Sequence, residues 1–204
     1  MLSHVIDGIS QRLMKCLMKS YRSVQAEKMA LVVLDTQPAN LENQHGLQDR
    51  LKNLIRGCRK AGVTVIFSDF GGKRASENLP LGVEKLFEQY ESNNSGILPE
   101  LAAQKSDIVL SERTTLSVFF DESLQSFLAE RGIEHLVFVG GFVELSVQSS
   151  ARHSSELGYH TTVLSDCCGY ITPQSHKASM EVTLPRMVHD VLTADQWLKK
   201  IRTH

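Results

Sequence analysis

The sequence predicts an α/β fold: a single domain of three layers, in which helices cover both faces of a six-stranded, mostly parallel β-sheet. Three observations support this prediction. Short apolar runs alternate with longer segments of helical period, as in repeated βαβ units. The first run, MALVVLD at 29–35, is apolar throughout, as expected for a strand buried on both faces. The 204 residues, 42% of them hydrophobic, suit one domain with a substantial core.

The predicted strands are short apolar or β-branched runs. They cover 29–35, 63–69, 106–111, 135–140, 160–166 and 189–193. In an open α/β sheet, ligands bind outside the carboxyl ends of the strands. We therefore expect any site among the residues at these ends, which are Asp35, Asp69–Phe70, Ser111–Arg113, Gly140–Gly141 and Asp166.

Helical periodicity predicts one helix between each pair of successive strands and one after the last strand. These helices cover 47–62, 83–90, 121–132, 144–158, 174–188 and 194–202. Gly62, Gly132 and Gly158 close three of them, as glycine commonly does. Thr193 is the expected N-cap of the last helix.

Residues 1–28 form an expected amphipathic helical extension that precedes the domain of residues 29–204. Its apolar residues share one helical stripe: Leu2, Val5, Ile6, Ile9, Leu13, Leu17, Tyr21 and Val24. An organelle transit peptide would also be amphipathic, basic and poor in acidic residues. We favour the alternative that this helix packs on its own domain or on a partner subunit.

Composition excludes several classes of function. A formal net charge of −1 gives no electrostatic case for binding nucleic acid or an anionic membrane. The four cysteines, Cys16, Cys58 and the adjacent Cys167 and Cys168, do not resemble a secreted disulfide scaffold, so we expect reduced thiols in a cytoplasmic protein. They form no CxxC pair, and no cluster of histidine and cysteine has the spacing of a zinc site. Nucleotide-binding glycine motifs are also missing. We therefore expect no metal and no cofactor.

Three residues at the strand ends are candidates for catalysis. Asp35 ends the first strand and can act as a general acid or base, although it could instead cap a turn. Arg113 could pair with Asp35 or bind an anionic group of a substrate, or it could be an ordinary surface arginine. Ser146 lies in the first turn of a predicted helix, where unpaired backbone amides can stabilise an oxyanion, but serine is also common there for structural reasons.

Separated segments together resemble the isochorismatase-like hydrolases, also called the cysteine hydrolase superfamily. ALVVLDTQPAN resembles the first strand of that family, which ends in its catalytic aspartate. Residues 113–169 resemble its longest signature, and the resemblance covers about 29–195. The matching positions in that signature are Ser117–Phe119, Gly140, Glu144, Val147, Gly158–Tyr159 and Asp166.

The resemblance implies where a catalytic site would lie and how it differs from that of relatives. The family's triad is Asp, Lys and Cys, and the corresponding positions here are Asp35, Arg113 and Ser146. It also implies an oxyanion-binding turn formed by Gly141, Phe142 and Ser146, with a cis peptide bond near Gly141–Phe142. Candidate residues for lining the substrate pocket are Gln37, Phe70, Phe119 and Val143.

Serine at position 146 argues against the thiolate mechanism of the family's amidases, because a hydroxyl has a much higher pKa than a thiol. Isochorismatases, which also lack the cysteine, use the aspartate as a general acid on a vinyl ether. The metal-binding histidines of nicotinamidases have no counterpart in SDFGGKRASEN at 68–78. We therefore expect neither a metal nor nicotinamidase activity.

The sequence leaves more than one function open. The first hypothesis is a divergent isochorismatase-like hydrolase that acts on an unidentified small molecule by aspartate-dependent acid/base chemistry. The second is a catalytically inactive member that binds a small anionic ligand or acts through subunit contacts. A scaffold assembled through residues 1–28 is compatible with either. The resemblance also implies a homo-oligomer, a dimer or larger, and neither nucleic acid nor membrane is an expected partner.

Overall fold

A computed structural model describes residues 25–41, 44–70, 96–101 and 103–202. Of the predicted extension at 1–28, only its last residues belong to this described part, and Ala26–Lys28 form a single 3₁₀ turn. The helix predicted at 83–90 also lies outside the described residues. Within the described part, no helix is long and apolar enough to cross a membrane.

The sheet contains six strands in the order β3-β2-β1-β4-β5-β6, and every pair of neighbours is parallel. The strands are β1 (Met29–Leu34), β2 (Thr64–Phe70), β3 (Ile108–Arg113), β4 (His135–Gly140), β5 (His160–Cys168) and β6 (Asp190–Leu192). The predicted α/β class and strand number are thus confirmed, and the sheet is parallel throughout rather than mostly so. Strand β3 lies two residues later than predicted, which makes Arg113 its last residue.

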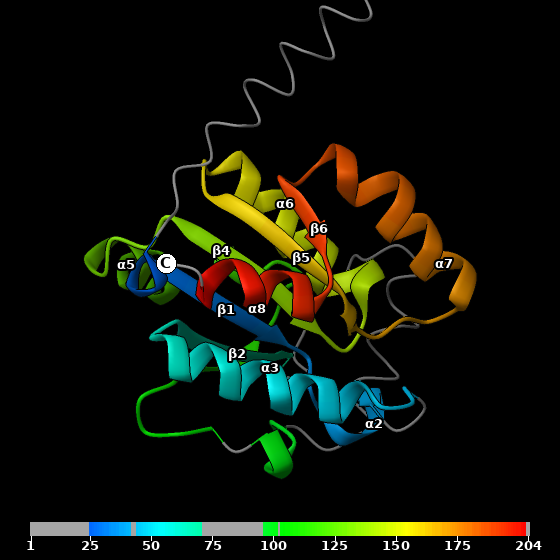
Figure 1. Ribbon diagram of the computed structural model, residues 1–204, viewed down its shortest axis with the longest axis horizontal. Helices are drawn as coiled ribbons and strands as arrows, with labels where there is room; N and C mark the ends of the chain where they lie inside the picture. Colours follow the sequence, from blue (N-terminus) through cyan, green and yellow to red (C-terminus); the bar gives the residue numbers. More distant parts are fainter. Residues whose placement is uncertain (1–24, 42–43, 71–95, 102, 203–204) are drawn as a thin grey trace, which may run out of the picture.

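Helices cover both faces of the sheet, which gives three layers (Figure 1). They are α2 (Pro38–Leu41), α3 (Leu47–Ala61), α5 (Glu122–Glu130), α6 (Gln148–Glu156), α7 (Pro173–Ala178) and α8 (Ala194–Arg202). Helices α3 and α8 lie in front of the sheet in Figure 1, and their apolar residues share one core cluster with alternate residues of β1. Thr193 caps α8 as predicted, because its Oγ1 accepts a hydrogen bond from the amide of Gln196 (3.3 Å).

Two predicted helices are not continuous. The segment predicted at 174–188 is α helix only to Ala178, and a π-helical turn (Ser179–Thr183) and a 3₁₀ turn (Leu184–Arg186) follow. Pro185 lies in this last turn and supplies no backbone N–H, so a regular α helix does not run through it. The segment predicted at 144–158 begins as a kinked π-helical turn (Val143–Val147), in which Leu145 has non-helical backbone angles (φ −108°, ψ −106°), before α6.

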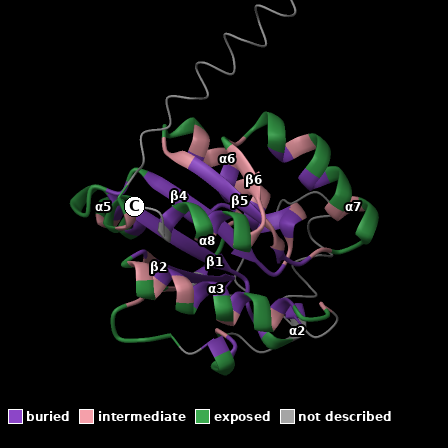
Figure 2. Cartoon of the chain, in the orientation of Figure 1, coloured by how far each residue is buried: buried purple, intermediate pink, exposed green. Residues whose placement is uncertain are grey.

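The core lies on both faces of β1, and Figure 2 shows this strand buried along its length. Leu31 and Val33 face the cluster under α3 and α8, whereas Ala30, Val32 and Leu34 face the cluster that includes side chains of α5 and α6. This alternation follows from the two-residue period of a strand. An apolar run without polar residues is therefore what a central parallel strand requires.

The strand order creates a topological switch point between β1 and β4. From β1 the chain adds β2 and β3 on one side of the sheet, and β4, β5 and β6 lie on the other side. Crossovers therefore leave in opposite directions at the carboxyl ends of β1 and β4, which is where α/β sheets open a crevice for ligands. Asp35 and Gly141 follow these two ends directly.

Candidate active site

Asp35 lies at the switch point with an unusual backbone conformation. Its φ is +53°, in the left-handed region that residues other than glycine rarely adopt, and it is only 1% exposed. The side chain of Asn40 helps to hold this turn by donating to the Asp35 carbonyl oxygen (3.0 Å). Carboxylate oxygen Oδ1 accepts a hydrogen bond from the amide of Phe70 (3.1 Å), whereas Oδ2 is buried and has no partner among the described residues. One oxygen of Asp35 is thus fixed, and the other remains available to an incoming group.

Glycine is required where the ends of β1, β4 and β5 meet, because their backbones touch there. A Cβ on Gly141 would lie 2.3 Å from the carbonyl oxygen of Asp35, and a Cβ on Gly169 would lie 1.9 Å from that of Gly141. A Cβ on Gly140 would meet the carbonyl oxygen of Leu34 at 2.0 Å. These approaches explain the glycine pair at 140–141, and they bring the turn after β4 against Asp35.

Arg113 reaches Asp35 from β3, across the intervening strand β2. A guanidinium has five N–H donors, and here protein oxygens accept hydrogen bonds from Nε, Nη1 and Nη2, with two acceptors at each Nη. Nε donates to Ser68 Oγ (3.3 Å). Nη1 donates to the carbonyl oxygens of Thr115 and of Leu116 (2.8 Å for Leu116). Nη2 donates to Asp35 Oδ1 and to Ser146 Oγ (3.1 Å for Ser146). An anionic substrate could bind Arg113 only by displacing one of these bonds. The geometry thus favours an ion pair with Asp35 over an anion-binding role.

Ser146 completes the group that sequence reasoning selected. It lies in the π-helical turn Val143–Val147 and is 2% exposed. Its hydroxyl oxygen accepts a hydrogen bond from Arg113, so its contact in the described part of the chain is with a cation rather than with a histidine or a carboxylate. Asp35, Arg113 and Ser146 therefore converge in space, but no base of the described residues is hydrogen-bonded to the serine hydroxyl.

The peptide bond at Gly141–Phe142 is trans, as are all peptide bonds of the described residues, so the cis bond implied by resemblance is wrong. Two backbone hydrogen bonds hold the turn that follows β4. The amide of Gly141 donates to the Leu34 carbonyl oxygen (2.9 Å), and the amide of Val143 donates to that of Gly169 (2.9 Å). These bonds to β1 and to the residue after β5 direct the chain into the turn with trans geometry.

Asp69 is a second buried carboxyl group beside Asp35 that the sequence prediction did not select. Its Oδ1 accepts a hydrogen bond from the amide of Thr36 (3.2 Å), and the residue is 8% exposed. Burial, and then the negative charge of Asp35, raise the pKa of Asp69 to about 6. Both aspartates end an apolar strand, VVLD and IFSD, so the same pattern that singled out Asp35 was also present at Asp69.

The four predicted pocket residues divide into two pairs. Gln37 donates to the carbonyl oxygen of Phe70 (3.2 Å), and the ring of Phe70 lies 5.9 Å from the guanidinium carbon of Arg113, so this pair belongs to the surroundings of Asp35. Val143 and Phe119 are buried in the core cluster on the α6 side of the sheet. The ring of Phe119 stacks on that of Tyr159 at 6.0 Å. Whether any of the four contacts a substrate stays a prediction.

Glu144 connects the Ser146 turn to the chain after β5. Its Oε1 accepts hydrogen bonds from the amide of Ile171 (3.1 Å) and from the hydroxyl of Ser175, whereas Oε2 is buried without a partner. This carboxylate therefore fixes the start of α7 against the turn. The resemblance marked Glu144 as a matching position, but not this contact.

Neither a metal cluster nor an activated thiol accompanies the site in the described part of the chain. No group of three or more His, Cys, Asp or Glu side chains could hold a metal ion there. Cys168 pairs in register with Gly140, close to the turn, but its thiol is buried and its pKa is raised well above the ordinary value by desolvation. Burial likewise raises the pKa of Cys167 to about 12. These thiols are therefore poor nucleophiles.

Comparison with known proteins agrees with this fold. Residues 29–196 match the isochorismatase domain. The uncharacterized isochorismatase family protein YwoC of Bacillus subtilis (strain 168) is 22% identical over 186 residues, which are 88% of this chain and 97% of YwoC. Ureidoacrylate amidohydrolase RutB of Acinetobacter baylyi (strain ATCC 33305 / BD413 / ADP1) is 39% identical over 85 residues, which are 41% of this chain and only 34% of RutB.

A solved structure is similar over most of its length. The cysteine hydrolase from Pseudomonas syringae pv. phaseolicola 1448A superposes with a TM-score of 0.75 at 15% identity, and the match covers 89% of this chain and 96% of that one. At this level of identity the likeness shows a shared fold.

Proposed function

Because residues 29–196 match its domain, the chain belongs to the isochorismatase family of hydrolases, and from this premise we propose that it hydrolyses a small molecule by acid/base chemistry centred on Asp35. One observation carries the proposal. The Asp35 carboxylate is buried at the switch point, Arg113 and the amide of Phe70 hold its Oδ1, and its Oδ2 meets no partner in the part of the chain that the structure describes. A buried, oriented and half-satisfied carboxylate is suited to taking a proton from water or returning it to a leaving group.

We assign the other two residues supporting roles. Arg113 balances the charge of Asp35 and fixes the orientation of its carboxylate, since protein oxygens already accept hydrogen bonds from each of its three nitrogens. Ser146 is a polar residue of the site rather than its nucleophile. Deprotonating a hydroxyl is less favourable than deprotonating a thiol by several pKa units, and each unit corresponds to about 1.4 kcal/mol. In this proposal, water attacks the substrate and Asp35 Oδ2 takes its proton.

The names of relatives suggest where to look for the substrate. RutB is a ureidoacrylate amidohydrolase, and its match here covers about a third of its length. We therefore propose ureido and amide compounds as the first class to test, and vinyl ethers as the second. The reaction would be hydrolysis in both cases.

Asp35→Asn tests the proposal directly, with Asp49→Asn as the matched control, because the side chain of Asp49 on α3 is 82% exposed. We expect Asp35→Asn to lower kcat by about 10²- to 10⁴-fold on any substrate that the protein turns over. The control should keep the wild-type rate, and circular dichroism should show both variants folded. An unchanged kcat in folded Asp35→Asn would rule out the proposed chemistry.

Ser146→Ala and Ser146→Cys separate the role of this residue from that of Asp35. If Ser146 is a polar contact, Ser146→Ala should retain activity within about tenfold, the effect of losing one hydrogen bond. Loss of all activity in folded Ser146→Ala would make Ser146 the nucleophile. Gain of amidase activity in Ser146→Cys would show that the surrounding site can support thiol chemistry.

A second candidate function is ligand binding without turnover. The observation that favours it is the contact of Ser146 with a cation instead of a base, together with the engagement of each Arg113 nitrogen. This candidate predicts compounds that raise Tm in wild type but not in Asp35→Asn, with no product detectable by mass spectrometry. Product formation would exclude it.

We also propose that the protein forms a homo-oligomer, a dimer or larger. Phe120, which is 70% exposed, and Val182, which is 51% exposed, are large apolar side chains that an interface could bury. Sedimentation velocity should then give a mass of at least two chains, and a monomer at micromolar concentration would contradict the proposal.

A further inference from the structure

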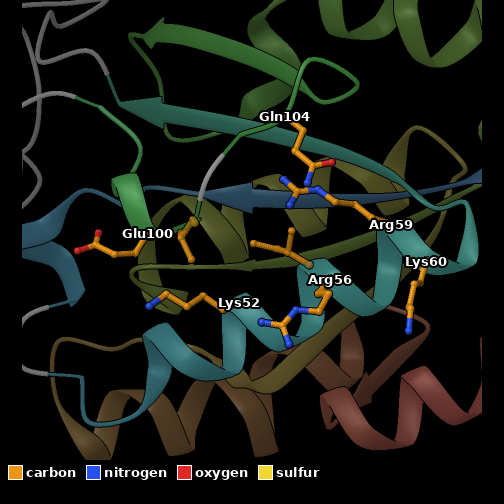
Figure 3. A pocket seen from close by; sticks show the side chains of 8 residues that line it. Lys52, Arg56, Arg59, Lys60, Glu100 and Gln104 are labelled. Atoms are coloured by element: carbon orange, nitrogen blue, oxygen red, sulfur yellow. The ribbon is translucent and has the colours of Figure 1, made fainter.

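A cavity of about 460 Å³ lies against helix α3 (Figure 3), and Asp35 is not among its lining residues. Its walls come from the outer side of α3 and from the segment that includes the 3₁₀ turn Pro99–Leu101. None of its lining residues contributes to the candidate active site described above. Its volume is in the range of cavities that hold small molecules.

The lining of this cavity is strongly basic. Lys52, Arg56 and Lys60 repeat every four residues along α3, so they share one helical face, and Arg59 joins them. Among the described residues that line the cavity, Glu100 is the one carboxylate. These described residues, four cations and one carboxylate, carry a formal charge of +3, although the whole chain carries −1. The positive charge is therefore a local feature.

Ordinary structural roles account for only part of this charge. Arg59 pairs with Asp107, whose side chain is 2% exposed, and the charges of Arg59 and Lys60 in the last turn of α3 also complement the helix dipole. Lys52 and Arg56 lie in earlier turns, where the dipole gives no such benefit. The carboxylate that Lys52 approaches, on Asp49, is 3.9 Å away and almost fully exposed, so this ion pair is weak.

The floor of the cavity is apolar. Ile55 is 1% exposed and Leu101 is 2% exposed, and both line the cavity between the charged side chains. Among the described lining residues there is no aromatic side chain, so a stacked base would find no ring partner in that part of the wall. The chemistry that fits is an oxyanion bound by the cations and a non-aromatic organic body packed on the floor.

We propose that this cavity binds a small organic phosphate. Guanidinium and ammonium groups are the side chains that bind phosphate oxygens most strongly, and arginine can do so with two parallel hydrogen bonds. Arg56 and Lys60 are exposed and can turn toward the ligand, whereas Arg59 stays on Asp107. A phosphate alone would fill only part of the volume, which leaves room for a sugar-sized body.

Isothermal titration calorimetry with ribose 5-phosphate and with inorganic phosphate, at low ionic strength, tests this proposal on the full chain. We expect saturable binding of ribose 5-phosphate that is tighter than that of inorganic phosphate. Arg56→Gln/Lys60→Gln should weaken it about tenfold or more, since two charge-assisted contacts are lost. Equal affinity for the two probes would overturn the organic part of the proposal, and absence of saturation would overturn the site.

The matched control removes the same charge from the opposite face of the sheet. Lys177→Gln/Arg186→Gln changes two exposed cations in and after α7, and it should leave the affinity for ribose 5-phosphate unchanged. If both double variants lose affinity equally, binding reflects total charge and the proposed site is wrong. Because none of the substituted residues touches Asp35, loss of binding in Arg56→Gln/Lys60→Gln is independent of the proposed hydrolysis.

Discussion

Arg113 donates a hydrogen bond to Asp35 in an ion pair whose side chains are 3% and 1% exposed, respectively. The pair links β3 to the end of β1 across β2, and it keeps the charge of a buried carboxylate compensated. Truncating one partner would leave the other charged and buried.

We expect Arg113→Lys to lower the free energy of unfolding by about 1–3 kcal/mol, because an ammonium keeps the charge but has three donors and cannot match the fork of hydrogen bonds that the guanidinium makes. Urea denaturation at neutral pH measures the change. Arg186→Lys at an exposed position is the control, and it should stay within about 0.5 kcal/mol of wild type. Equal stability of Arg113→Lys and wild type would mean that the additional hydrogen bonds of the guanidinium do not hold β3 to β1.

The close approach of Gly141 to Asp35 predicts a steric effect. In Gly141→Ala the new methyl group would lie 2.3 Å from the Asp35 carbonyl oxygen, so the turn after β4 must move away from β1. We expect a loss of about 3 kcal/mol or more in the free energy of unfolding.

Gly57→Ala, within helix α3, serves as the control for this effect, because the neighbours its Cβ would meet are atoms of the flexible side chain of Leu198 on α8 (2.8 Å to Cδ2), not backbone. Higher helix propensity offsets that contact, so the net change should be within about 1 kcal/mol. Thermal unfolding followed by circular dichroism compares the two variants, and equal losses would contradict the backbone contact at Gly141.

The raised pKa of Asp69 predicts a pH-dependent loss of stability. The folded state holds this proton up to about pH 6, whereas the unfolded chain releases it near 3.8, the ordinary pKa of an aspartate side chain. The contribution of Asp69 to the free energy of unfolding therefore falls as pH rises from about 4 to about 6, and it is constant above that range.

Asp69→Asn keeps an acceptor for the amide of Thr36 and removes the titrating charge. We expect the free energy of unfolding of this variant, measured relative to that of wild type, to rise by about 1–3 kcal/mol between pH 4 and pH 7. Urea denaturation across that range gives the difference. A constant difference between variant and wild type would show that Asp69 does not titrate in the folded protein with a raised pKa.

The burial of His135 predicts the opposite dependence on pH, with a free energy of unfolding that falls as the pH is lowered. It is 2% exposed, it contacts Thr162 Oγ1 through Nε2 (2.9 Å), and burial lowers its pKa to about 3, with His160 adding to the effect. A buried neutral histidine contributes stability that is complete above about pH 6.5 and is lost as pH falls toward 3.

We expect His135→Gln to flatten this acid-induced loss by about 1–3 kcal/mol between pH 6.5 and pH 4. The exposed His45 provides the control, since His45→Gln should retain the wild-type pH dependence. If the free energy of unfolding of His135→Gln fell with decreasing pH as steeply as that of wild type, groups other than His135 would cause the loss of stability in acid.

The fold could be predicted from the sequence because its signals are local. A continuous apolar run identifies each central strand, and a helical period identifies each crossover, so the alternation that defines a parallel α/β sheet is readable along the chain. Residues 29–34 and 135–140 were identified almost to the residue. The segment at 174–188 was not, because the π-helical and 3₁₀ turns after Ala178 keep nearly the same spacing of apolar residues as an α helix.

The sequence by itself determined the strand ends to within two residues, and so that Asp35, Arg113 and the turn containing Ser146 lie at one edge of the sheet. Only the tertiary structure decided how they meet. The guanidinium of Arg113 donates hydrogen bonds to Ser68, Leu116 and Ser146, which come from three separate segments. The raised pKa of Asp69 depends on its burial beside Asp35. Local patterns record the period of an element, whereas hydrogen-bond partners and desolvation arise only when distant segments pack together.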